Sequence, residues 1–277
     1  MKPLFKYILP YIFSSLLIMT SCRSINRWQQ VDEGLAIGEF ETAGAKPFQK
    51  TSLFIIKIDP LFYELKLLSA SELDRIALTT KQWSKKHNLI AAINAGMYET
   101  DMMSNVGFMK NYEHENNTHI NSTHKSLAVF NPKKNTDPPF YLHDLDETNV
   151  DSILSRYHTA IQNLRLIKRP AENRWENQNE KWSEAALGQD VSGNVLFIYS
   201  RRPVSMYDFN QALLRLPINL VCAQHLDGGP HASLYFSHNG LVRNYQGAVS
   251  LNHDMEEIIQ GIALPNIIGV RKRDKNK

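Results

Sequence analysis

This chain of 277 residues is 43% hydrophobic and 21% charged, so it can bury the core of one large domain or two small ones. Its net charge is +3, and the basic residues are scattered apart from those in residues 271–277. Such a pattern excludes a basic stripe that follows a nucleic-acid backbone, so we expect no nucleic-acid partner.

Residues 1–22 have the pattern of an export signal. Lys2 and Lys6 flank an apolar stretch that is too short for a comfortable membrane span, and small residues and a cysteine follow it. The junction MTSC resembles a bacterial lipobox, in which Cys22 is acylated and begins the mature chain; an ordinary cleaved signal and a plain anchor are the alternatives. We therefore expect a lipoprotein of the bacterial cell envelope, anchored to a membrane and facing the periplasm or the cell surface.

The mature chain, residues 23–277, begins with strand-like segments. Residues 53–58 and 63–69 are rich in strand-forming residues, and the turn at 59–62 between them predicts a hairpin or meander. Residues 79–88 predict a short helix, capped by Thr79 or Thr80, that leads into a buried strand at 89–94.

The second half of the chain alternates loops with apolar segments. Residues 111–124 and 170–183 are polar and predict loops, and a solvated loop is preferred to a metal site for the three histidines of the first, His114, His119 and His124. Residues 194–200 predict a strand, and 206–216 a helix that Pro217 ends. Cys222 follows within an apolar run and is predicted to be a small buried hydrophobe.

These elements predict the α+β class: one catalytic domain with a core at about residues 28–270, in which mixed, curved β-sheets outnumber a few helices. Two turns stand out because each follows an apolar run and places a polar residue before a glycine. Asn94 precedes the first, and Asp227 precedes the second. Glycine permits positive φ and lets the backbone approach a ligand closely. If Gly228 has positive φ, Gly228→Val should damage both binding and stability. The two corners therefore predict one shared cleft, with two purely structural turns as the alternative.

Four ordered segments resemble the motifs of the phosphodiester glycosidase family, whose members remove a sugar from a phosphodiester: AINAGMY, SNVGFM, the AALGQD strand with the segment after it, and HLDGGPHASLYF. The match runs through roughly residues 28–270. Two departures accompany it. Ser183 and Glu184 stand where many relatives carry an arginine, and His231 stands where similar bacterial sequences have a glutamate.

The resemblance implies the roles of individual residues. Asp227 would activate water or stabilise an oxocarbenium-like centre, and His231 would shuttle a proton, unless it is simply an exposed histidine. Asn94 and Asp190 complete the catalytic set. The residues implied in substrate binding are Gly96, Tyr98, Gly107, Arg201, Gly228, Gly229 and Ser233.

The implied function is an envelope-anchored hydrolase that cleaves a glycosyl phosphodiester or a related saccharide linkage; the alternative is a catalytically inactive glycan-binding lipoprotein of the same fold. Its expected partners are the saccharide substrate and, through the lipid anchor, a membrane. No cofactor is implied with certainty, and the metal is unknown. Asp190, Asp227 and carbonyls of the glycine turns are oxygen ligands of the kind that calcium prefers, so a calcium site is one alternative.

The predicted anchor can be tested by metabolic labelling with a palmitate analogue. We expect the label on the wild-type protein and not on Cys22→Ala, because the thiol is the acylation site. Equal labelling of both proteins would remove the anchor.

Overall fold

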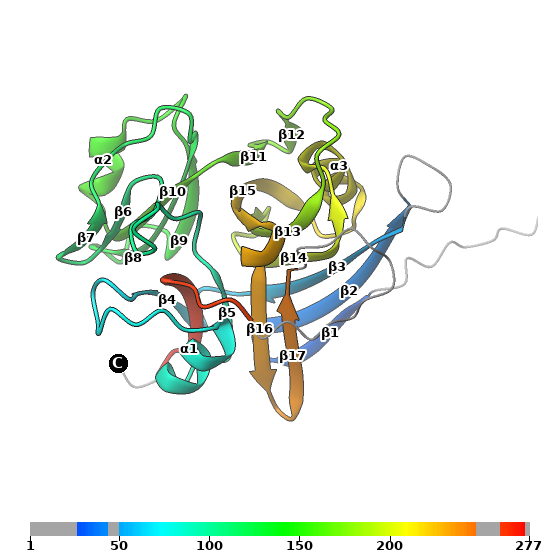
Figure 1. Ribbon diagram of the computed structural model, residues 1–277, viewed down its shortest axis with the longest axis horizontal. Helices are drawn as coiled ribbons and strands as arrows, with labels where there is room; N and C mark the ends of the chain where they lie inside the picture. Colours follow the sequence, from blue (N-terminus) through cyan, green and yellow to red (C-terminus); the bar gives the residue numbers. More distant parts are fainter. Residues whose placement is uncertain (1–26, 44–49, 248–260, 275–277) are drawn as a thin grey trace, which may run out of the picture.

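The structure, a computed structural model, describes residues 27–43, 50–247 and 261–274. The predicted signal peptide and Cys22 lie outside these residues. Figure 1 shows three sheets, with α1, α2 and α3 at their outer sides. In the described part of the chain, no helix has the length and hydropathy needed to cross a membrane.

The first sheet has eight strands in the order β1-β2-β3-β14-β13-β15-β11-β12, and neighbouring strands are antiparallel. Its strands are β1 (Trp28–Asp32), β2 (Leu35–Ala43), β3 (Lys50–Ile58), β11 (Arg165–Lys168), β12 (Glu172–Asn173), β13 (Trp182–Asp190), β14 (Val195–Val204) and β15 (Leu220–Gly228). The central strand β14 is buried along its first six residues, which explains its continuous apolar sequence.

Two five-stranded antiparallel sheets complete the architecture. The second sheet contains β6 (Met109–Asn111), β7 (His114–Asn117), β8 (Ser126–Pro132), β9 (Phe140–Asp144) and β10 (Tyr157–Asn163). The third contains β4 (Tyr63–Ser69), β5 (Ala91–Asn94), β16 (Ser233–His238), β17 (Leu241–Gln246) and β18 (Asn266–Lys272).

The main core lies where the three sheets face one another. Ile56 of β3, Ile93 of β5 and Ile161 of β10 are fully buried in it. Alternate residues of these strands point to the outer faces, as the two-residue period of a strand requires. Each outer face is therefore a second apolar surface that needs a cover.

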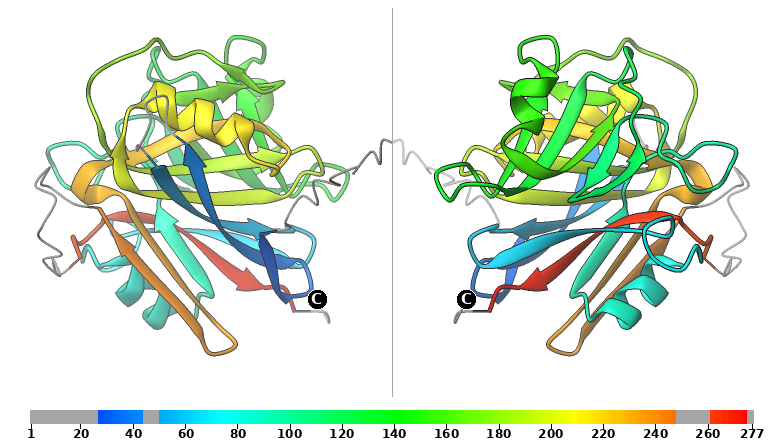
Figure 2. Two further views of the ribbon diagram at one scale, coloured as in Figure 1. Left: turned by 90° about the vertical axis from the view of Figure 1, so that its right-hand side faces the viewer. Right: turned by 90° about the vertical axis from the view of Figure 1, so that its left-hand side faces the viewer.

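One helix covers the outer face of each sheet, and Figure 2 shows α3 and α1 on opposite sides of the strands. Phe209 of α3 (Met206–Arg215) packs on the first sheet, Ile153 of α2 (Val150–Leu154) on the second, and Trp83 of α1 (Thr80–His87) on the third. α1 begins at Thr79, one of the two caps that its sequence predicts, and α3 begins at Ser205, whose side chain accepts a hydrogen bond from the Asp208 N–H.

The α+β class, with strands dominating, is confirmed. The predicted strands at 53–58 and 63–69 and the helices at 79–88 and 206–216 are present as β3, β4, α1 and α3. The predicted pairing of the first two strands is wrong, because β3 pairs with β2 and β14, whereas β4 pairs with β18 in another sheet. Both strands present apolar side chains to the main core, so the chain crosses that core instead of turning back beside β3.

The predicted loops contain short strands. Residues 111–124 include β7, which pairs with β6, and residues 170–183 include β12 and the start of β13. Their polar sequences follow from their positions, because β7 and β12 are edge strands of their sheets, where one side of the backbone is open to solvent.

Candidate active site

The candidate site lies where strands of all three sheets end beside one another (Figure 1). The N–H of His225 on β15 donates to the carbonyl of Leu164, the residue after β10, over 2.9 Å. The N–H of Ser233, at the start of β16, donates to Asn94 Oδ1 at the end of β5 over 3.1 Å. These two bonds attach β10 and β5 to the segment around the end of β15.

The two glycine turns singled out in the sequence lie together. Asp227 is near the end of β15, and its Oδ2 lies 3.7 Å from Nδ1 of His231 in the 3-10 turn η1 (Gly229–His231). The His231 ring packs edge-on against Tyr98 of the first turn, with 5.2 Å between ring centroids. The two glycine turns are therefore brought beside one another, as the sequence predicts, through the contact of Tyr98 with His231.

A buried ion pair accompanies Asp227. Glu184 of β13 and His225 of β15 are joined through Glu184 Oε1 and His225 Nδ1, with 1% and 3% of their side chains exposed. Glu184 Oε2 accepts a hydrogen bond from Trp182 Nε1 over 2.7 Å. Burial lowers the pKa of His225, but the charge and hydrogen bond of Glu184 outweigh burial, so the pKa is raised and the imidazolium is favoured.

We call six residues the corner site: Asn94, Tyr98, Glu184, His225, Asp227 and His231. Glu184 stands out in the sequence only as a departure from an arginine, and His225 does not stand out at all. The available signal was the polar pair Gln224 and His225 inside an otherwise apolar strand that leads to Asp227.

The Asp227 carboxyl has the properties of a proton-transfer group. Its side chain is 14% exposed, and burial raises its pKa to about 6, against the lowering effects of His225, the Gly228 N–H and His231. The Gly228 N–H donates to Asp227 Oδ1 over 2.7 Å. A carboxyl that titrates near neutral pH in a polar corner is a candidate general base or acid.

Buried amides gather around Gly96. A Cβ atom on Gly96 would lie 2.5 Å from both Asn105 Oδ1 and Asn163 Oδ1, so this position accepts only glycine. Asn94 Nδ2, Asn105 Oδ1 and Asn163 Oδ1 are buried without a hydrogen-bond partner among the described residues. Buried amide atoms rarely lack partners, so this group is suited to bind water or the hydroxyls of a sugar.

His124 corrects the prediction of a solvated loop, because it is buried, with Nδ1 3.0 Å from the position of a Cβ atom on Gly107. Burial and the nearby charge of His225 lower its pKa. The same Cβ atom would lie 2.7 Å from the carbonyl of Gln162. Gly107 thus permits the close packing of Gln162 and His124, and its role in substrate binding stays a prediction.

Asp190 is not brought to the corner site. It caps the hairpin between β13 and β14, accepting hydrogen bonds from the N–H groups of Ser192 and Asn194 over 2.9 Å each. Ala185 is the partner of Asp227 across the sheet, so Asp190 lies five residues further along β13, about 17 Å away at the usual rise of a strand.

This separation bears on the calcium site left open by the sequence. Asp190 and Asp227 are too far apart to share one ion, so these residues do not fit the calcium site considered above. Within residues 27–43, 50–247 and 261–274, no three His, Cys, Asp or Glu side chains are grouped as metal ligands.

Ser233 and Arg201 flank the corner site in different ways. The Ser233 hydroxyl lies 2.7 Å from Thr80 Oγ1, so it is the backbone N–H of Ser233 that contacts Asn94. Arg201 is exposed on β14, directly after Ser200, which pairs with Glu184. The guanidinium is therefore carried at the same end of the sheet as the buried ion pair.

The condition of positive φ at Gly228 is not met, so strain from positive φ is not what makes Gly228→Val damaging. Gly228 has an extended backbone with φ −123°, and Gly229 is the residue with positive φ, at 58°. Gly228 is required for a different reason: a Cβ atom there would lie 2.2 Å from Trp182 Cδ1. Close packing of the indole, not backbone conformation, excludes larger residues.

Comparison with known proteins gives one family and solved structures of similar fold. The profile of the phosphodiester glycosidase family matches residues 87–271. No curated protein sequence matches this chain. Among solved structures, the chain is similar to the catalytic domain of zebrafish N-acetylglucosamine-1-phosphodiester alpha-N-acetylglucosaminidase, auto-inhibited by its pro-peptide: the TM-score is 0.64 and the identity 14%, over 88% of this chain and 86% of that one.

A hypothetical protein from Synechocystis is also similar, with a TM-score of 0.60 and 12% identity. The alignment covers 87% of this chain and 62% of that one, so this chain matches less than two thirds of its length. At these identities, both structures support the fold alone.

The packing of Trp182 on Gly228 predicts the effect of Gly228→Ala. We expect a loss of about 1–3 kcal/mol in the free energy of unfolding, because the added methyl displaces the indole from Glu184. Chemical denaturation measures the change. In a Trp182→Ala background the same substitution should cost little, and an equal cost in both backgrounds would contradict this explanation.

The raised pKa of Asp227 predicts a pH-dependent gain in stability for Asp227→Asn. The folded pKa, about 6, is above the ordinary value of 3.8, so stability from this group is present below about pH 4 and is lost as the pH rises through 6. Asparagine does not ionise, so the variant keeps its stability as the pH rises through 6. The variant should therefore be more stable by about 1–3 kcal/mol at pH 8, with the difference disappearing at pH 4. Denaturation curves at both pH values test this, and a variant less stable at pH 8 would refute it.

Proposed function

This chain belongs to the phosphodiester glycosidase family, and from this premise we propose that the corner site hydrolyses a glycosyl phosphodiester at the bond between the sugar C1 atom and the phosphate oxygen. The observation that carries the proposal is the buried Asp227 carboxyl, with a pKa near 6, beside the Glu184–His225 ion pair. A phosphate leaves more easily than an alcohol, so this reaction needs little acid assistance.

Asp227 is the group that activates water. In its ionised form the carboxylate accepts a proton from water, the water oxygen bonds to C1, and the electron pair of the C1–O bond leaves with the phosphate. The carboxylate also stabilises positive charge that develops on the sugar ring. His231, whose side chain is 37% exposed and lies 3.7 Å from Asp227, passes the proton to solvent.

His225 supplies the positive charge for the diester. Its Nδ1 is bonded to Glu184, and no other hydrogen bond of this ring is found among the described residues, so Nε2 is the atom available to a phosphate oxygen. Glu184 keeps the ring protonated and oriented, which makes it a positioning residue. A fixed cation at the departing phosphate stabilises the charge that develops there.

The remaining polar groups would bind the rest of the substrate. The unpartnered amide atoms of Asn94, Asn105 and Asn163 match the hydroxyls of a sugar. Exposed Arg201, at the same end of the sheet, would contact the charged group beyond the scissile bond. The substrate class is therefore a saccharide joined to phosphate, and the amides do not select one sugar.

We also propose that the enzyme acts at the bacterial cell envelope. The N-terminal signal pattern and Cys22 support this, and Cys22 lies six positions before Trp28, where β1 begins. An acylated Cys22 would hold the domain, residues 23–277, close to a membrane surface, where envelope glycans with phosphodiester links are accessible.

Replacing the proposed base tests the mechanism. Asp227→Asn should fold normally and lower turnover of a synthetic glycosyl phosphodiester by about 100-fold or more, because a positioned proton acceptor is lost. In the wild-type enzyme, kcat/KM should fall below about pH 6, where the carboxyl becomes protonated.

Detergent-purified full-length protein is the material for this assay, and sugar release is the readout. Asp190→Asn is the matched control, since this aspartate lies on the same pair of strands and outside the corner site. Full activity of Asp227→Asn, or an equal loss in a folded Asp190→Asn, would contradict the assignment. Binding of the diester by the wild type without turnover would contradict the proposed reaction.

The positioning role of Glu184 makes a separate prediction. Glu184→Gln removes the charge that holds the proton on His225, so the pKa of His225 should fall and turnover should drop by about 100-fold. NMR titration of the imidazole measures the first effect and steady-state kinetics the second. Glu172→Gln, an exposed glutamate on β12, serves as the control. A lost turnover with an unchanged His225 titration would show that Glu184 acts in another way.

A further inference from the structure

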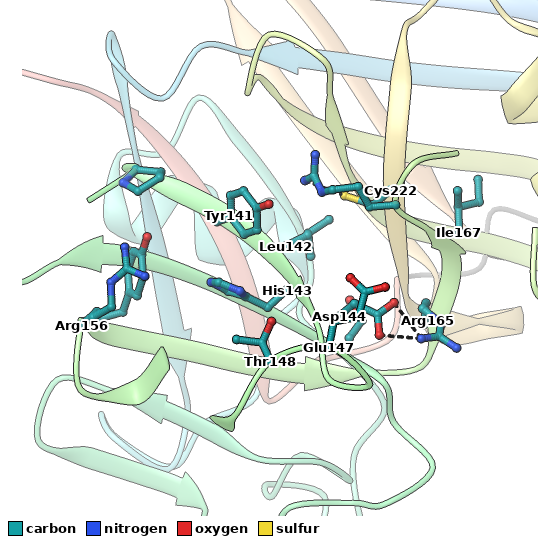
Figure 3. Close-up of a pocket in the computed structure, with 14 residues that line it drawn as sticks. Tyr141, Leu142, His143, Asp144, Glu147, Thr148, Arg156, Arg165, Ile167 and Cys222 are labelled. Atoms are coloured by element: carbon teal, nitrogen blue, oxygen red, sulfur yellow. Dashed lines mark hydrogen bonds and ion pairs between the residues drawn. The ribbon is translucent and has the colours of Figure 1, made fainter. Parts of the chain in front are cut away.

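A cavity of about 320 Å³ lies away from the corner site, between the second sheet and the strands β11 and β15 of the first (Figure 3). It shares no residue with the corner site. Cys222 lines it and stands five residues before Asp227 on β15, which corresponds to about 17 Å along the strand. Its polar lining includes Tyr141, His143, Asp144, Glu147, Arg156, Arg165 and Arg169.

The acidic residues of this cavity are already paired. Arg165 Nη1 donates to both oxygens of Asp144 over 2.7 Å, as the dashed lines of Figure 3 show. Glu147 Oε1 lies 2.7 Å from Lys168 Nζ. Neither carboxylate is therefore left to repel an anion by an uncompensated charge.

Arg169 is different from the other arginines of the cavity. Arg156 pairs with Asp137 and Arg165 with Asp144, whereas Arg169 has no carboxylate partner among the described residues. An arginine that is half-buried without a counter-charge is a favourable place for an anionic ligand.

The Arg169 guanidinium is held in place by its other contacts. Its central carbon lies 4.7 Å from the centroid of the Tyr141 ring, a cation–π arrangement. Nη2 donates to Gln189 Oε1 and to Cys222 Sγ. All the hydrogen bonds that the described residues give this guanidinium use Nη2, so Nε and Nη1 are available to donate to a ligand.

His143 provides a second polar group in the same cavity, and Figure 3 shows it between Arg156 and the Asp144–Arg165 pair. Its Nε2 is buried and has no hydrogen-bond partner in the described part of the chain. Burial and the positive charges of Arg156 and Arg169 lower its pKa to about 4, so the ring is neutral at pH 7. A neutral imidazole can donate one hydrogen bond to an acceptor oxygen.

We propose that this cavity binds a small organic oxyanion, a phosphate or carboxylate group on a sugar-sized body, with Arg169 as the anchor and His143 as a second polar contact. The volume is at the lower end of the range for small-molecule sites, about 300–1,000 Å³. Leu142 and Ile167 supply an apolar wall for the body of the ligand. The site is separate from the corner site and does not depend on the reaction proposed there.

Calorimetric titration of the full-length protein tests the proposal, with inorganic phosphate, a hexose phosphate and a hexuronate as probes. Comparison of the three probes distinguishes a phosphate ligand from a carboxylate ligand. Binding of at least one probe is expected, and Arg169→Gln should weaken it about tenfold or more, because a charge-assisted pair of hydrogen bonds is lost. Arg174→Gln, an exposed arginine paired with Glu172, is the matched control and should bind like the wild type.

NMR of the His143 imidazole locates the ligand. The probe should shift this resonance, identified by its loss in His143→Gln, and raise the pH at which the ring titrates, because a bound anion offsets the charges of Arg156 and Arg169. If Arg169→Gln does not fold, Arg169→Lys replaces it. Lysine keeps the positive charge but cannot donate the two parallel hydrogen bonds of a guanidinium, so it should weaken binding less than glutamine does. Absence of binding by every probe, unchanged affinity in the Arg169 variant, or loss of binding in Asp227→Asn would overturn the proposal.

Discussion

The charge buried between β13 and β15 is the constraint on which the corner site depends. A carboxylate taken out of water costs several kcal/mol unless a counter-charge and hydrogen bonds compensate. Glu184 has both, in His225 and in the indole N–H of Trp182. The indole in turn occupies the space that a side chain at Gly228 would need. The ion pair therefore determines the residue beside Asp227 as well as the protonation of His225.

Asp227 takes its chemistry from this environment. Burial raises its pKa to about 6, so the folded protein carries an ionised carboxylate at neutral pH at some expense of stability. Groups with perturbed pKa values are concentrated at functional sites, where a strained charge is useful for proton transfer. The chain belongs to the phosphodiester glycosidase family, and in the function proposed for it this carboxyl would be the proton acceptor. The buried amides around Gly96 would then provide polar groups for the sugar.

Local sequence patterns are sufficient to predict those elements that a few neighbouring residues encode. The capping box at Thr79 begins α1, Ser205 begins α3, and the apolar run of β14 is a central strand. The same patterns failed for the pairing of β3 with β4, because the short turn between them is equally compatible with a hairpin and with a crossing between sheets. Which connection forms depends on the distant strands that pair with each of them: β14 pairs with β3, and β18 pairs with β4.

The sequence by itself determined the family, the α+β class and the two glycine corners, because ordered motifs and strand periodicity are properties of adjacent residues. Only the tertiary structure decided which polar residues share a site. Glu184 and His225 are 41 positions apart and become partners because β13 and β15 are neighbours. Asp190 is on the same strand as Glu184 but lies at the other end of β13, where it caps a hairpin. Burial and charge pairing arise from contacts across strands, which no short stretch of sequence contains.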